Sequence, residues 1–414
     1  MNKEAPKGWK SNKLTNICLI KGGKRLPKGE TLSDIPTSHP YIRVTDFERY
    51  SVNLDNIKYI TDEIYNVIKN YTISSDDLYI SIAGSTGMIG AIPEKLNGAN
   101  LTENAAKIVI KDQNIIDKNY LKYYLNSSTI QQQIKELTVG VGVPKLALNR
   151  IEGINIVYPN TIAEQREIAQ VLDTMSDIIR LREECISHAQ DLIPALFQEM
   201  FGDANNNITK STIVRFRDCI DLNPSKPNLD DNLNVTFLGM KDINEKGQVD
   251  LSTTKTYEEV KKGFTNFENE DVLLAKITPC FENGKAAIVR NLLNGYGFGS
   301  TEFYVLRPHQ NIILPEYVYA IIKSYTFAEP GKYKMTGAAG QKRLPKDYIL
   351  NYKFPLPPLE AQEQFAEKVR EINSYIEEQQ EELENAKQMF QSLLHHAFTG
   401  ELTNNKPQGD TLEK

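Results

Sequence analysis

Two features of this sequence could in principle mark a reactive or cofactor-binding site. Residues 84–90 read Gly-Ser-Thr-Gly-Met-Ile-Gly and follow an apolar run that is typical of a strand. No lysine follows, as a phosphate-binding loop requires, and there is no G-x-G with a ribose-binding acid about 20 residues further on. We interpret the segment as a turn between strands. The four cysteines are scattered, with no C-x-x-C and no nearby histidine cluster, so we expect reduced, structural thiols rather than a metal site.

Three further groups resemble parts of catalytic sites without completing one. Asn223-Pro224-Ser225 is similar to the N-P-P-aromatic loop of adenine methyltransferases, but the second proline and the aromatic residue are absent. Asp271, Glu282 and Lys285 resemble a nuclease carboxylate set, yet the Glu-to-Lys spacing is one residue too long. The pair His395-His396 lies in a predicted amphipathic helix without carboxylates placed as co-ligands. The sequence therefore predicts no catalysis, no cofactor and no metal in this chain, and it favours a binding protein.

Side chains that bind phosphates or base edges cluster in Gly-rich loops of two separate blocks. Lys and Arg neutralise phosphates, while Arg, Asn and Gln can make paired hydrogen bonds to base edges. The first block supplies these candidates for DNA binding: Lys21, Lys24, Arg25, Lys28, Arg43, Thr45, Ser85, Thr86 and Lys145. The second supplies Lys241, Lys276, Thr278, Asn283, Lys285, Lys332, Lys334, Gln341, Lys342 and Arg343. Further polar residues in these loops are Arg49, Asn100, Asn104 and Lys226. Any one of them is more often a solvated surface residue, and only the clustering raises the interest of the set.

Two long helices must position these loops. Between residues 159 and 203, apolar residues recur at alternating steps of four and three, which is the a/d seam of a heptad helix. The seam comprises Ile168, Leu172, Met175, Ile179, Ile186, Ala189, Ile193, Leu196 and Met200. A parallel row, Val171, Ile178, Cys185 and Leu192, widens the apolar stripe, so we expect the helix to bury more than one seam.

The same seam recurs 197 positions later, in residues 356–401. It comprises Phe365, Val369, Ile372, Ile376, Leu383, Ala386, Phe390, Leu393 and Ala397. Two such helices in one chain most simply pack on each other, although a stalk or a dimer zipper is an alternative for any heptad helix. Landmarks upstream repeat at similar offsets: Ile115-Ile116 matches Ile312-Ile313, and Thr102-Glu103 matches Thr301-Glu302. We infer an internal duplication of a globular block followed by a long helix.

The blocks mix short β runs with one amphipathic helix each, which predicts an α+β fold with a pseudo-twofold duplication. The predicted parts are a first recognition domain (1–158), a first long helix (159–203), a second recognition domain (204–355), a second long helix (356–401) and a flexible tail (402–414). Prolines precede both helices, and Gly202 and Gly400 are predicted to end them.

The net charge of −6 is unevenly distributed along the chain. Residues 159–203 hold 3 basic and 9 acidic residues, and residues 356–401 hold 3 and 10, so the two helices carry a net charge of −13. The blocks are mildly basic, at +4 and +3, which weakly favours a polyanionic partner. No run approaches 18 apolar residues and the first residues lack a signal region, so we expect a cytoplasmic protein without a membrane span.

The blocks and the segments before each helix resemble the specificity subunit of type I restriction–modification systems. The first motif runs from Pro159 to Ile168 and contains Glu164-Gln165, and the second is Pro357-Pro358-Leu359-Glu-Ala-Gln362-Glu-Gln-Phe365. The second copy departs from the E-Q pair, because Ala361 stands at the glutamate position. Further support comes from residues 276–285, 299–302 and 337–341.

This resemblance implies two target-recognition domains separated by an antiparallel pair of helices. It also implies that the chain binds double-stranded DNA and two methyltransferase (modification) subunits, which a restriction/translocase subunit then joins. S-adenosylmethionine, ATP and Mg²⁺ would belong to those partners. Three alternatives remain open at this point: a DNA-modifying enzyme with an unrecognised site, a coiled-coil scaffold that binds no nucleic acid, and a specificity subunit whose partners are fused.

Overall fold

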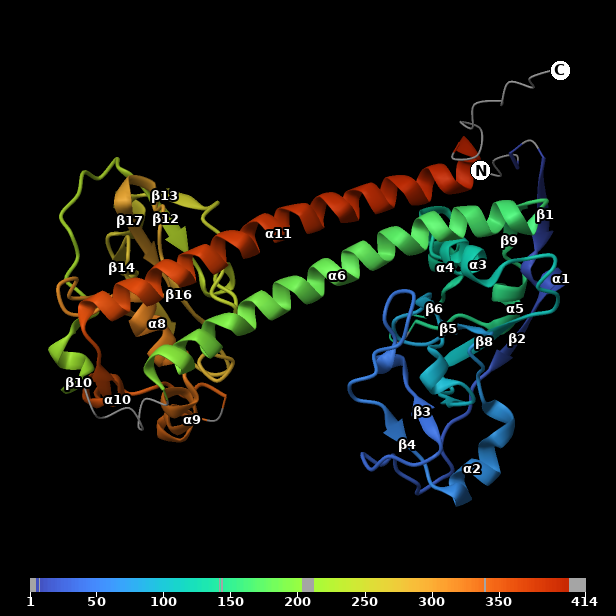
Figure 1. Ribbon diagram of the computed structural model, residues 1–414, viewed down its shortest axis with the longest axis horizontal. Helices are drawn as coiled ribbons and strands as arrows, with labels where there is room; N and C mark the ends of the chain where they lie inside the picture. Colours follow the sequence, from blue (N-terminus) through green and yellow to red (C-terminus); the bar gives the residue numbers. More distant parts are fainter. Residues whose placement is uncertain are drawn as a thin grey trace. The chain divides into compact units, whose positions relative to one another are not determined.

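The computed structural model describes residues 5–6, 8–140, 142, 144–202, 212–338 and 340–401, and Figure 1 labels most of its helices and strands. The chain divides into two compact units: residues 1–182 with 382–414, and residues 183–381. Each unit therefore combines one of the two predicted blocks with a part of both long helices. The predicted flexible tail, 402–414, lies outside the described residues.

The first unit is built around an antiparallel four-stranded sheet in the order β2-β8-β5-β6. Its strands are β2 (Cys18–Gly22), β8 (Ala105–Ile110), β5 (Leu78–Ser81) and β6 (Ile89–Ala91). A smaller sheet has the order β4-β3-β7 and contains β4 (Lys58–Tyr59), β3 (Pro40–Ile42) and β7 (Asn100–Leu101). A two-stranded ladder joins β1 (Trp9–Lys13) to β9 (Asn155–Pro159). The helices are α1 (Leu14–Ile17), α2 (Asp62–Ile68), α3 (Lys118–Leu125), α4 (Ser128–Leu137) and α5 (Leu148–Glu152).

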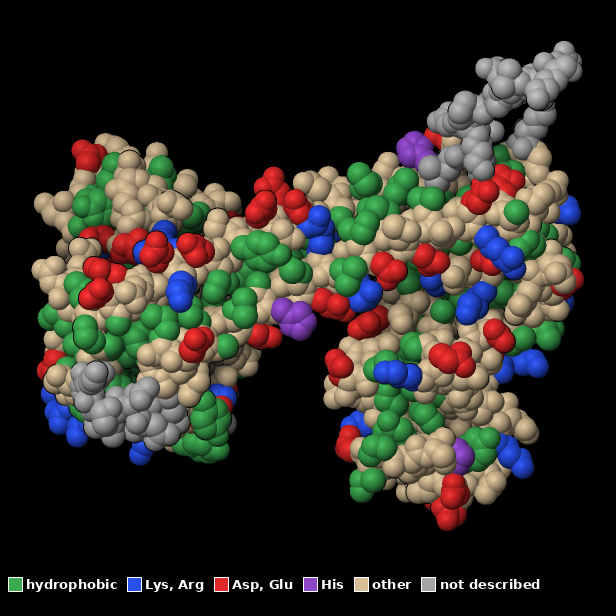
Figure 2. All heavy atoms as spheres, viewed as in Figure 1, with side chains coloured by type: hydrophobic (Ala, Val, Ile, Leu, Met, Phe, Trp, Pro, Cys, Tyr) green, Lys and Arg blue, Asp and Glu red, His purple; other side chains and the backbone are tan. Residues whose placement is uncertain are grey.

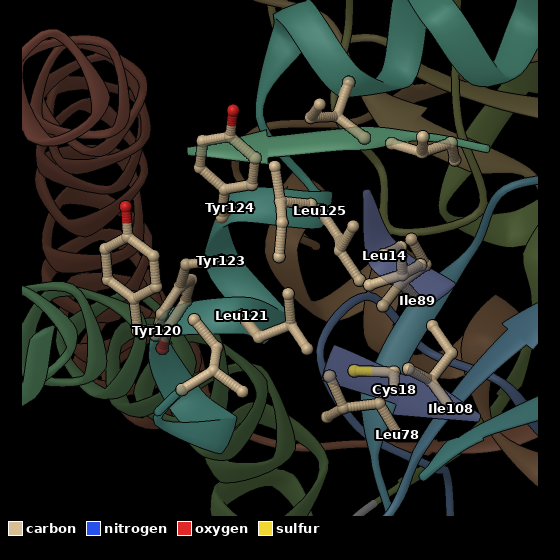
Figure 3. Packing of buried hydrophobic residues seen from close by; sticks show 14 of the residues in the cluster. Leu14, Cys18, Leu78, Ile89, Ile108, Tyr120, Leu121, Tyr123, Tyr124 and Leu125 are labelled. Carbon is tan, nitrogen blue, oxygen red and sulfur yellow. The ribbon is translucent and has the colours of Figure 1, made fainter. Parts of the chain in front are cut away.

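Helix α3 joins the core of this unit to the long helices. Its leucines, Leu121 and Leu125, lie among the apolar side chains of the four-stranded sheet and its surroundings (Figure 3). On its other side, Tyr120 and Tyr124 make edge contacts with Phe398 of α11 (Leu359–Thr399), with ring centroids 5.6 and 5.1 Å apart. One short amphipathic helix thus buries both of its faces, and this connects the sheet to the coiled-coil segment.

The second unit repeats this plan. Its central sheet has the order β11-β18-β15-β16 and contains β11 (Ile220–Leu222), β18 (Phe303–Pro308), β15 (Val272–Ala275) and β16 (Ala286–Ile288). The smaller sheet, in the order β13-β12-β17-β14, contains β13 (Thr254–Thr256), β12 (Asn234–Leu238), β17 (Tyr296–Gly299) and β14 (Thr265–Glu268). The ladder pairs β10 (Thr212–Arg215) with β19 (Lys353–Leu356). The helices are α7 (Tyr257–Val260), α8 (Pro315–Lys323), α9 (Tyr325–Lys334) and α10 (Lys346–Asn351).

Strand order and strand direction match between the units, so the predicted duplication is present in the topology. In both small sheets, the second and third strands of the order given above form a parallel pair, β3 with β7 and β12 with β17. The second unit adds β14 at the edge of its small sheet, where the first has only a bridge between Thr72 and Asn100. The predicted α+β architecture with two blocks and two long helices is confirmed.

The long helices are α6 (Ile162–Phe201) and α11. In the first unit the beginning of α6 shares a core with the end of α11, through Ile168, Leu172 and Phe390. In the second unit the end of α6 shares a core with the beginning of α11, through Phe197 and Phe365. The two helices are therefore antiparallel, as predicted. Gly202 and Gly400 both have left-handed backbone conformations, with φ of 70° and 80°, and they end the helices.

The predicted seam is buried or partly buried, whereas the second predicted row is exposed except for Cys185, which is partly buried. Of the seam, Ile168, Leu172, Ile186, Phe365, Val369, Ile376, Leu383 and Phe390 are buried, whereas Met175, Ile179, Ile193 and Ile372 are partly buried. Val171, Ile178 and Leu192 of the second row are 44, 37 and 55% exposed, so the expectation that this row is also buried was wrong. The partner helix covers only the narrow a/d seam, which is the usual width of a coiled-coil contact.

A buried glutamine fastens each block to the start of its long helix. Gln165 is fully buried; its amide nitrogen donates to the carbonyls of Ile115 (3.1 Å) and Pro159 (3.0 Å), and its oxygen accepts the backbone N–H of Asp117 (2.8 Å). Gln362, 197 positions later, is equally buried. It makes the same three bonds to Ile312 (3.1 Å), Pro357 (3.0 Å) and Leu314 (3.0 Å). Each glutamine thus provides hydrogen-bond partners for three backbone groups, which explains why a glutamine occurs in both the P-x-x-x-x-E-Q and the P-P-L-x-x-Q segments.

Beside the glutamines, the two junctions carry opposite charges. In the first unit Asp173 of α6 accepts hydrogen bonds from Asn119 (3.0 Å), Lys122 (3.1 Å) and Tyr123 (2.6 Å) of α3. At the positions equivalent to Asp173 and Asn119, the second unit has Arg370 and Glu316, with Arg370 Nη1 2.9 Å from Glu316 Oε1. Glu316 is buried and also binds Arg290. The acid is on the long helix in one unit and on the block in the other.

The alignment of the turns before β8 and β18 differs by one residue from the sequence-based match. The backbone N–H of Asn104 faces the Thr102 hydroxyl, and that of Glu302 faces the Ser300 hydroxyl. The carbonyls of Asn104 and Glu302 accept from Ile82 and Lys276 respectively. Thr102-Glu103 therefore does not correspond to Thr301-Glu302. Asn104 corresponds to Glu302 instead, so the offset between the two turns is one residue shorter than the offset given by the sequence-based match.

We predict that Gln165→Leu destabilises the first unit by about 3 kcal/mol, because it leaves one N–H and two carbonyls buried without partners. Denaturant unfolding would measure the loss, and amide exchange should show opening at the β9–α6 junction. Gln132→Leu on α4, where the glutamine is exposed, is the matched control and should change stability little. Equal stability of the two variants would contradict the fastening role.

We also predict that Asp173→Arg costs about 3–5 kcal/mol, since it leaves the buried Lys122 without its acid. Burial lowers the pKa of Lys122, and Asp173 opposes that shift. Asp177→Arg, at an exposed position of the same helix, serves as the control. Adding Asn119→Glu to Asp173→Arg reproduces the pair of the second unit and should restore part of the loss; a failure to restore any stability would rule out the charge explanation.

Candidate nucleic-acid interface

The loops with the predicted binding residues meet at one end of each central sheet. In the first unit β2 and β5 both run antiparallel to β8, so the ends of β2 and β5 lie beside the start of β8. Lys21, Lys24, Arg25 and Lys28 lie at or just after the end of β2. Ser85 and Thr86 follow β5, and the turn 102–104 precedes β8. The topology therefore brings three segments, distant in sequence, to one sheet end.

The loop after α4 completes this surface. Lys145 forms backbone bridges with Val139 and with Ala83, and the N–H of Leu146 donates to the carbonyl of Ile82 at 2.9 Å. Thr86 is 3.3 Å from Thr138 between their hydroxyl oxygens. The predicted residues Lys145, Ser85 and Thr86 are consequently neighbours of the β2 loop, although about 60 to 120 residues separate them from it in the sequence.

An arginine–glutamate pair occupies the centre of this sheet end. Arg25 Nε donates to Glu103 Oε1 at 2.8 Å, while the Arg25 side chain remains 78% exposed. Gly23 makes the arrangement possible, because a Cβ there would lie 2.1 Å from the carbonyl oxygen of Thr102. The hydrogen bond to Glu103 raises the pKa of Arg25. Burial tends to raise the pKa of Glu103, but hydrogen bonds from Arg25 and from its own turn outweigh this and lower it. Both groups are charged at neutral pH.

Two shallow hollows flank the pair, and Arg25 and Glu103 line both. The first has a volume of about 420 Å³ and includes Lys28, Tyr41 and Arg43. The second has a volume of about 410 Å³, and among its lining residues are Asn104, Val139 and Lys145. Val139 is 53% exposed, so this hollow presents a basic, an amide and an apolar group together. Such a mixture is suited to base edges, which offer acceptors, donors and the thymine methyl group.

The second unit assembles its own version at the same sheet end. Thr278 and Lys342 exchange two bonds: the Thr278 N–H donates to the Lys342 carbonyl (3.0 Å), and the Lys342 N–H donates to the Thr278 hydroxyl (3.1 Å). This places Gln341, Lys342 and Arg343 beside Lys276. Arg343 binds Glu302 through Nε (3.0 Å to Oε2) and Nη2 (2.7 Å to Oε1). Burial lowers the pKa of Lys276, helped by Arg343 and Lys346 and opposed by Glu302.

The other predicted residues lie elsewhere or are already bound. Arg43 is held by Asp46 (2.5 and 3.1 Å) and by the carbonyl of Asn56 (3.0 Å). Lys285 is buried and donates to the carbonyl of Met240 at 2.9 Å. Lys332 pairs with Glu329 on α9, and Lys334 is exposed in the last turn of that helix. Exposed residues outside the two central pairs are Thr45, Lys241 and Asn283.

The residues that resembled catalytic sets do not assemble. Asp271 is buried and holds Arg307 through two bonds of 2.8 Å, while Lys285 is bound to Met240 as described. Residues 84–87 form a turn between β5 and β6, with Gly84 and Gly87 at positive φ, as predicted. Within the described ranges, no group of three or more His, Cys, Asp or Glu could hold a metal ion. No helix among these residues is long and apolar enough to cross a membrane.

Sequence reasoning missed the acids of this surface. Glu103 and Glu302 were noticed as landmarks of the repeat, but a search for phosphate- and base-binding groups favours basic and amide residues and passes over carboxylates. A usable signal is present in the sequence, since each acid belongs to the turn directly before the central strand of its block. A charge that recurs at a sheet end among basic loops predicts an ion pair there.

Residues 6–188 and 220–385 match the family described as type I restriction modification DNA specificity domain. Among curated relatives, the EcoAI specificity subunit of Escherichia coli is 38% identical over 180 residues, which is 42% of this chain and 30% of that protein. The EcoEI specificity subunit of the same species is 42% identical over 139 residues, or 33% of this chain and 23% of that protein. The chain thus spans less than a third of these two relatives.

A longer alignment exists with the StySPI specificity subunit of Salmonella potsdam, which is 22% identical over 96% of this chain and 90% of that protein. Two solved structures share the fold. The S subunit of the M. genitalium type I system has a TM-score of 0.56 at 15% identity and covers 96% of this chain and 97% of its own. A chain from a work on complex assembly and conformational transition of the type I system has a TM-score of 0.55 at 17% identity, over 96% of this chain and all of its own. The chain therefore belongs to the type I restriction–modification DNA specificity family, as its sequence predicted.

Proposed function

We propose that this subunit recognises an asymmetric DNA target made of two half-sites, one for each block. The proposed recognition domains are residues 1–158 and 204–355, and the helices 159–203 and 356–401 connect them. Double-stranded DNA is the ligand of both domains, and the sheet ends described above are the contact surfaces. Since DNA in a bacterial cell is in the cytoplasm, we expect the protein to act there.

One observation supports this proposal most strongly: equivalent backbone positions carry different recognition groups in the two domains. Ile82 corresponds to Lys276, and Asn104 corresponds to Glu302. The bridge residue Lys145 corresponds to Arg343. Base identity is distinguished by the donor and acceptor pattern in the major groove. Two domains that read different sequences therefore need the same backbone fold but different side chains at their sheet ends. Identical end groups would instead favour a palindromic target.

The long helices are proposed to bind the partner subunits. We expect two methyltransferase subunits, joined by restriction/translocase subunits either as separate chains or fused with the modification subunits. Acidic side chains are exposed along both helices (Figure 2), which disfavours DNA as their ligand. On α6 in the first unit, Val171, Ile178 and Leu181 are exposed, the last by 54%. An apolar row of this kind on a charged helix suits protein docking.

S-adenosylmethionine, ATP and Mg²⁺ belong to the partner subunits of this family. The task left to this chain is to choose the DNA sequence and to hold its partners beside it. Sequence choice through hydrogen bonds at the sheet ends requires no bound cofactor.

We predict that replacing residues 1–158 with the corresponding block of another specificity subunit changes one methylated half-site and preserves the other. Sequencing of methylated bases in cells that carry the hybrid complex would show this. The reciprocal replacement of residues 204–355 is the matched control and should change the opposite half. A hybrid that alters both half-sites would contradict the assignment of one half-site to each domain.

We further predict that Val171→Glu combined with Ile178→Glu abolishes assembly with the methyltransferase subunits. Stability should change by no more than about 0.5 kcal/mol, because both side chains are exposed. Size-exclusion mass measurements on the co-expressed proteins would report assembly. Val67→Glu, at a 68% exposed position of α2, adds charge away from the helix and should leave the complex intact. If the helix variant assembles as wild type does, the partner surface lies elsewhere.

A further inference from the structure

We propose that Arg25 and Arg343 each read a guanine, one in each half-site, and that Glu103 and Glu302 position them for it. The inference rests on the proposed function and makes it more specific, since it names a base and the residues that select it. Arg25 and Arg343 would be specificity-determining residues. The two glutamates would be positioning residues that act through the arginines.

The hydrogen bonds leave the correct groups of each guanidinium available. Arg25 uses Nε for Glu103, so its terminal nitrogens Nη1 and Nη2 can bind another acceptor. Arg343 uses Nε and one hydrogen of Nη2 for Glu302. Its Nη1 makes a long hydrogen bond, of 3.4 Å, to the carbonyl of Gln341. At least one N–H therefore remains on each terminal nitrogen of both arginines. Two parallel N–H groups match O6 and N7 of guanine, the base edge with two adjacent acceptors in the major groove.

The glutamates favour a base over a phosphate as the ligand of these arginines. A carboxylate about 3 Å from a guanidinium offsets part of its charge and weakens its attraction for a phosphate. A guanine edge is neutral and depends less on that attraction. Lys24 and Lys28 on the same loop are exposed and suit phosphates better.

Holding the side chain in advance also lowers the entropic cost of binding. An arginine loses rotamer freedom when it is immobilised on DNA, by about 0.5–1.5 kcal/mol for a flexible side chain. In the free protein Arg25 and Arg343 are already held by their acids, although they are 78 and 45% exposed. The pair of Arg307 with Asp271 is more shielded, at 27 and 1% exposed.

The two pairs are built from non-equivalent residues of the same fold. Because β2 pairs with β8 and β11 pairs with β18, Ile20 is equivalent to Leu222. Counting the same number of residues onward from each, the position equivalent to Arg25 in the second unit is occupied by Pro227. Glu103 corresponds to Thr301, by the turn alignment given above. The two domains thus form an arginine–glutamate pair from residues at different positions of the shared fold. We infer that the guanine lies at a different place within each half-site.

The test uses the specificity subunit assembled with its methyltransferase subunits. Methylated-base sequencing first gives the wild-type target, and binding is then measured to duplexes in which single guanines are replaced by 7-deazaguanine, which lacks the N7 acceptor. We expect one guanine per half-site to be sensitive. Arg25→Ala and Arg25→Lys should each weaken binding to the native duplex about tenfold to hundredfold, and 7-deazaguanine in the first half-site should then cause no further loss. The second half-site should keep its sensitivity, and Arg343→Ala should show the converse.

The Glu103→Gln variant tests whether Glu103 positions Arg25 for a base or acts only through its negative charge. We expect non-specific binding to become stronger, because a negative charge is removed, while discrimination between guanine and other bases falls. Arg166→Ala is the matched control, since Arg166 is a 68% exposed arginine paired with Asp117 in the same unit but on α6. It should leave the base preference unchanged.

Two results would overturn the inference. One is an Arg25→Ala complex that binds all sequences more weakly by the same factor and with a salt slope reduced by about one, which is the behaviour of a phosphate contact. The other is an unchanged response of Arg25→Ala to 7-deazaguanine. A wild-type complex that methylates no bipartite target would instead overturn the proposed function itself.

Discussion

Three hydrogen bonds from one buried amide side chain, made twice, govern how this chain is organised. Gln165 and Gln362 each satisfy an N–H and two carbonyls where the block meets the first turns of its long helix. These backbone groups belong to segments about 45 residues apart, and each glutamine side chain bridges the two segments of its unit. A glutamine carries both donors and an acceptor on one planar group, which meets this need with a single residue.

The charged pairs beside the glutamines distinguish the two junctions from each other. Asp173 lies on the long helix and Lys122 on the block in the first unit, whereas Arg370 lies on the long helix and Glu316 on the block in the second. A block placed on the wrong helix end would bring like charges together in a partly buried site, at a cost of several kcal/mol. The repeat that makes the chain modular also makes such mispairing possible. Opposite polarity at the two junctions selects against it, while the glutamines hold both equally.

Much of this organisation could be predicted from the sequence, and the remainder has physical reasons. The heptad steps and the offset of 197 predicted both helices and the duplication, because periodicity is a local property of the chain. Val171 and Leu192 were misjudged for the same reason: an apolar row has the same spacing whether a partner within the chain or another protein covers it. The loops of the candidate site were found by composition. Their convergence depends on strand pairing between residues far apart, and Glu103 became visible as the partner of Arg25 only when the pairing of β2 with β8 was known.

The distribution of charge fits the proposal that recognition takes place at the sheet ends. The long helices carry a net charge of −13 and the blocks are mildly basic, so a polyanion is repelled from the connecting segments and attracted to the blocks. Attraction of this kind brings no sequence preference, because phosphates are the same everywhere along DNA. Preference requires groups that are poor phosphate ligands and good base ligands. An arginine already paired with a carboxylate has this property, and so does an amide such as Asn104 in the hollow beside it. In the recognition proposed above, the acids among the basic loops matter as much as the lysines, since they convert attraction to DNA into choice between sequences.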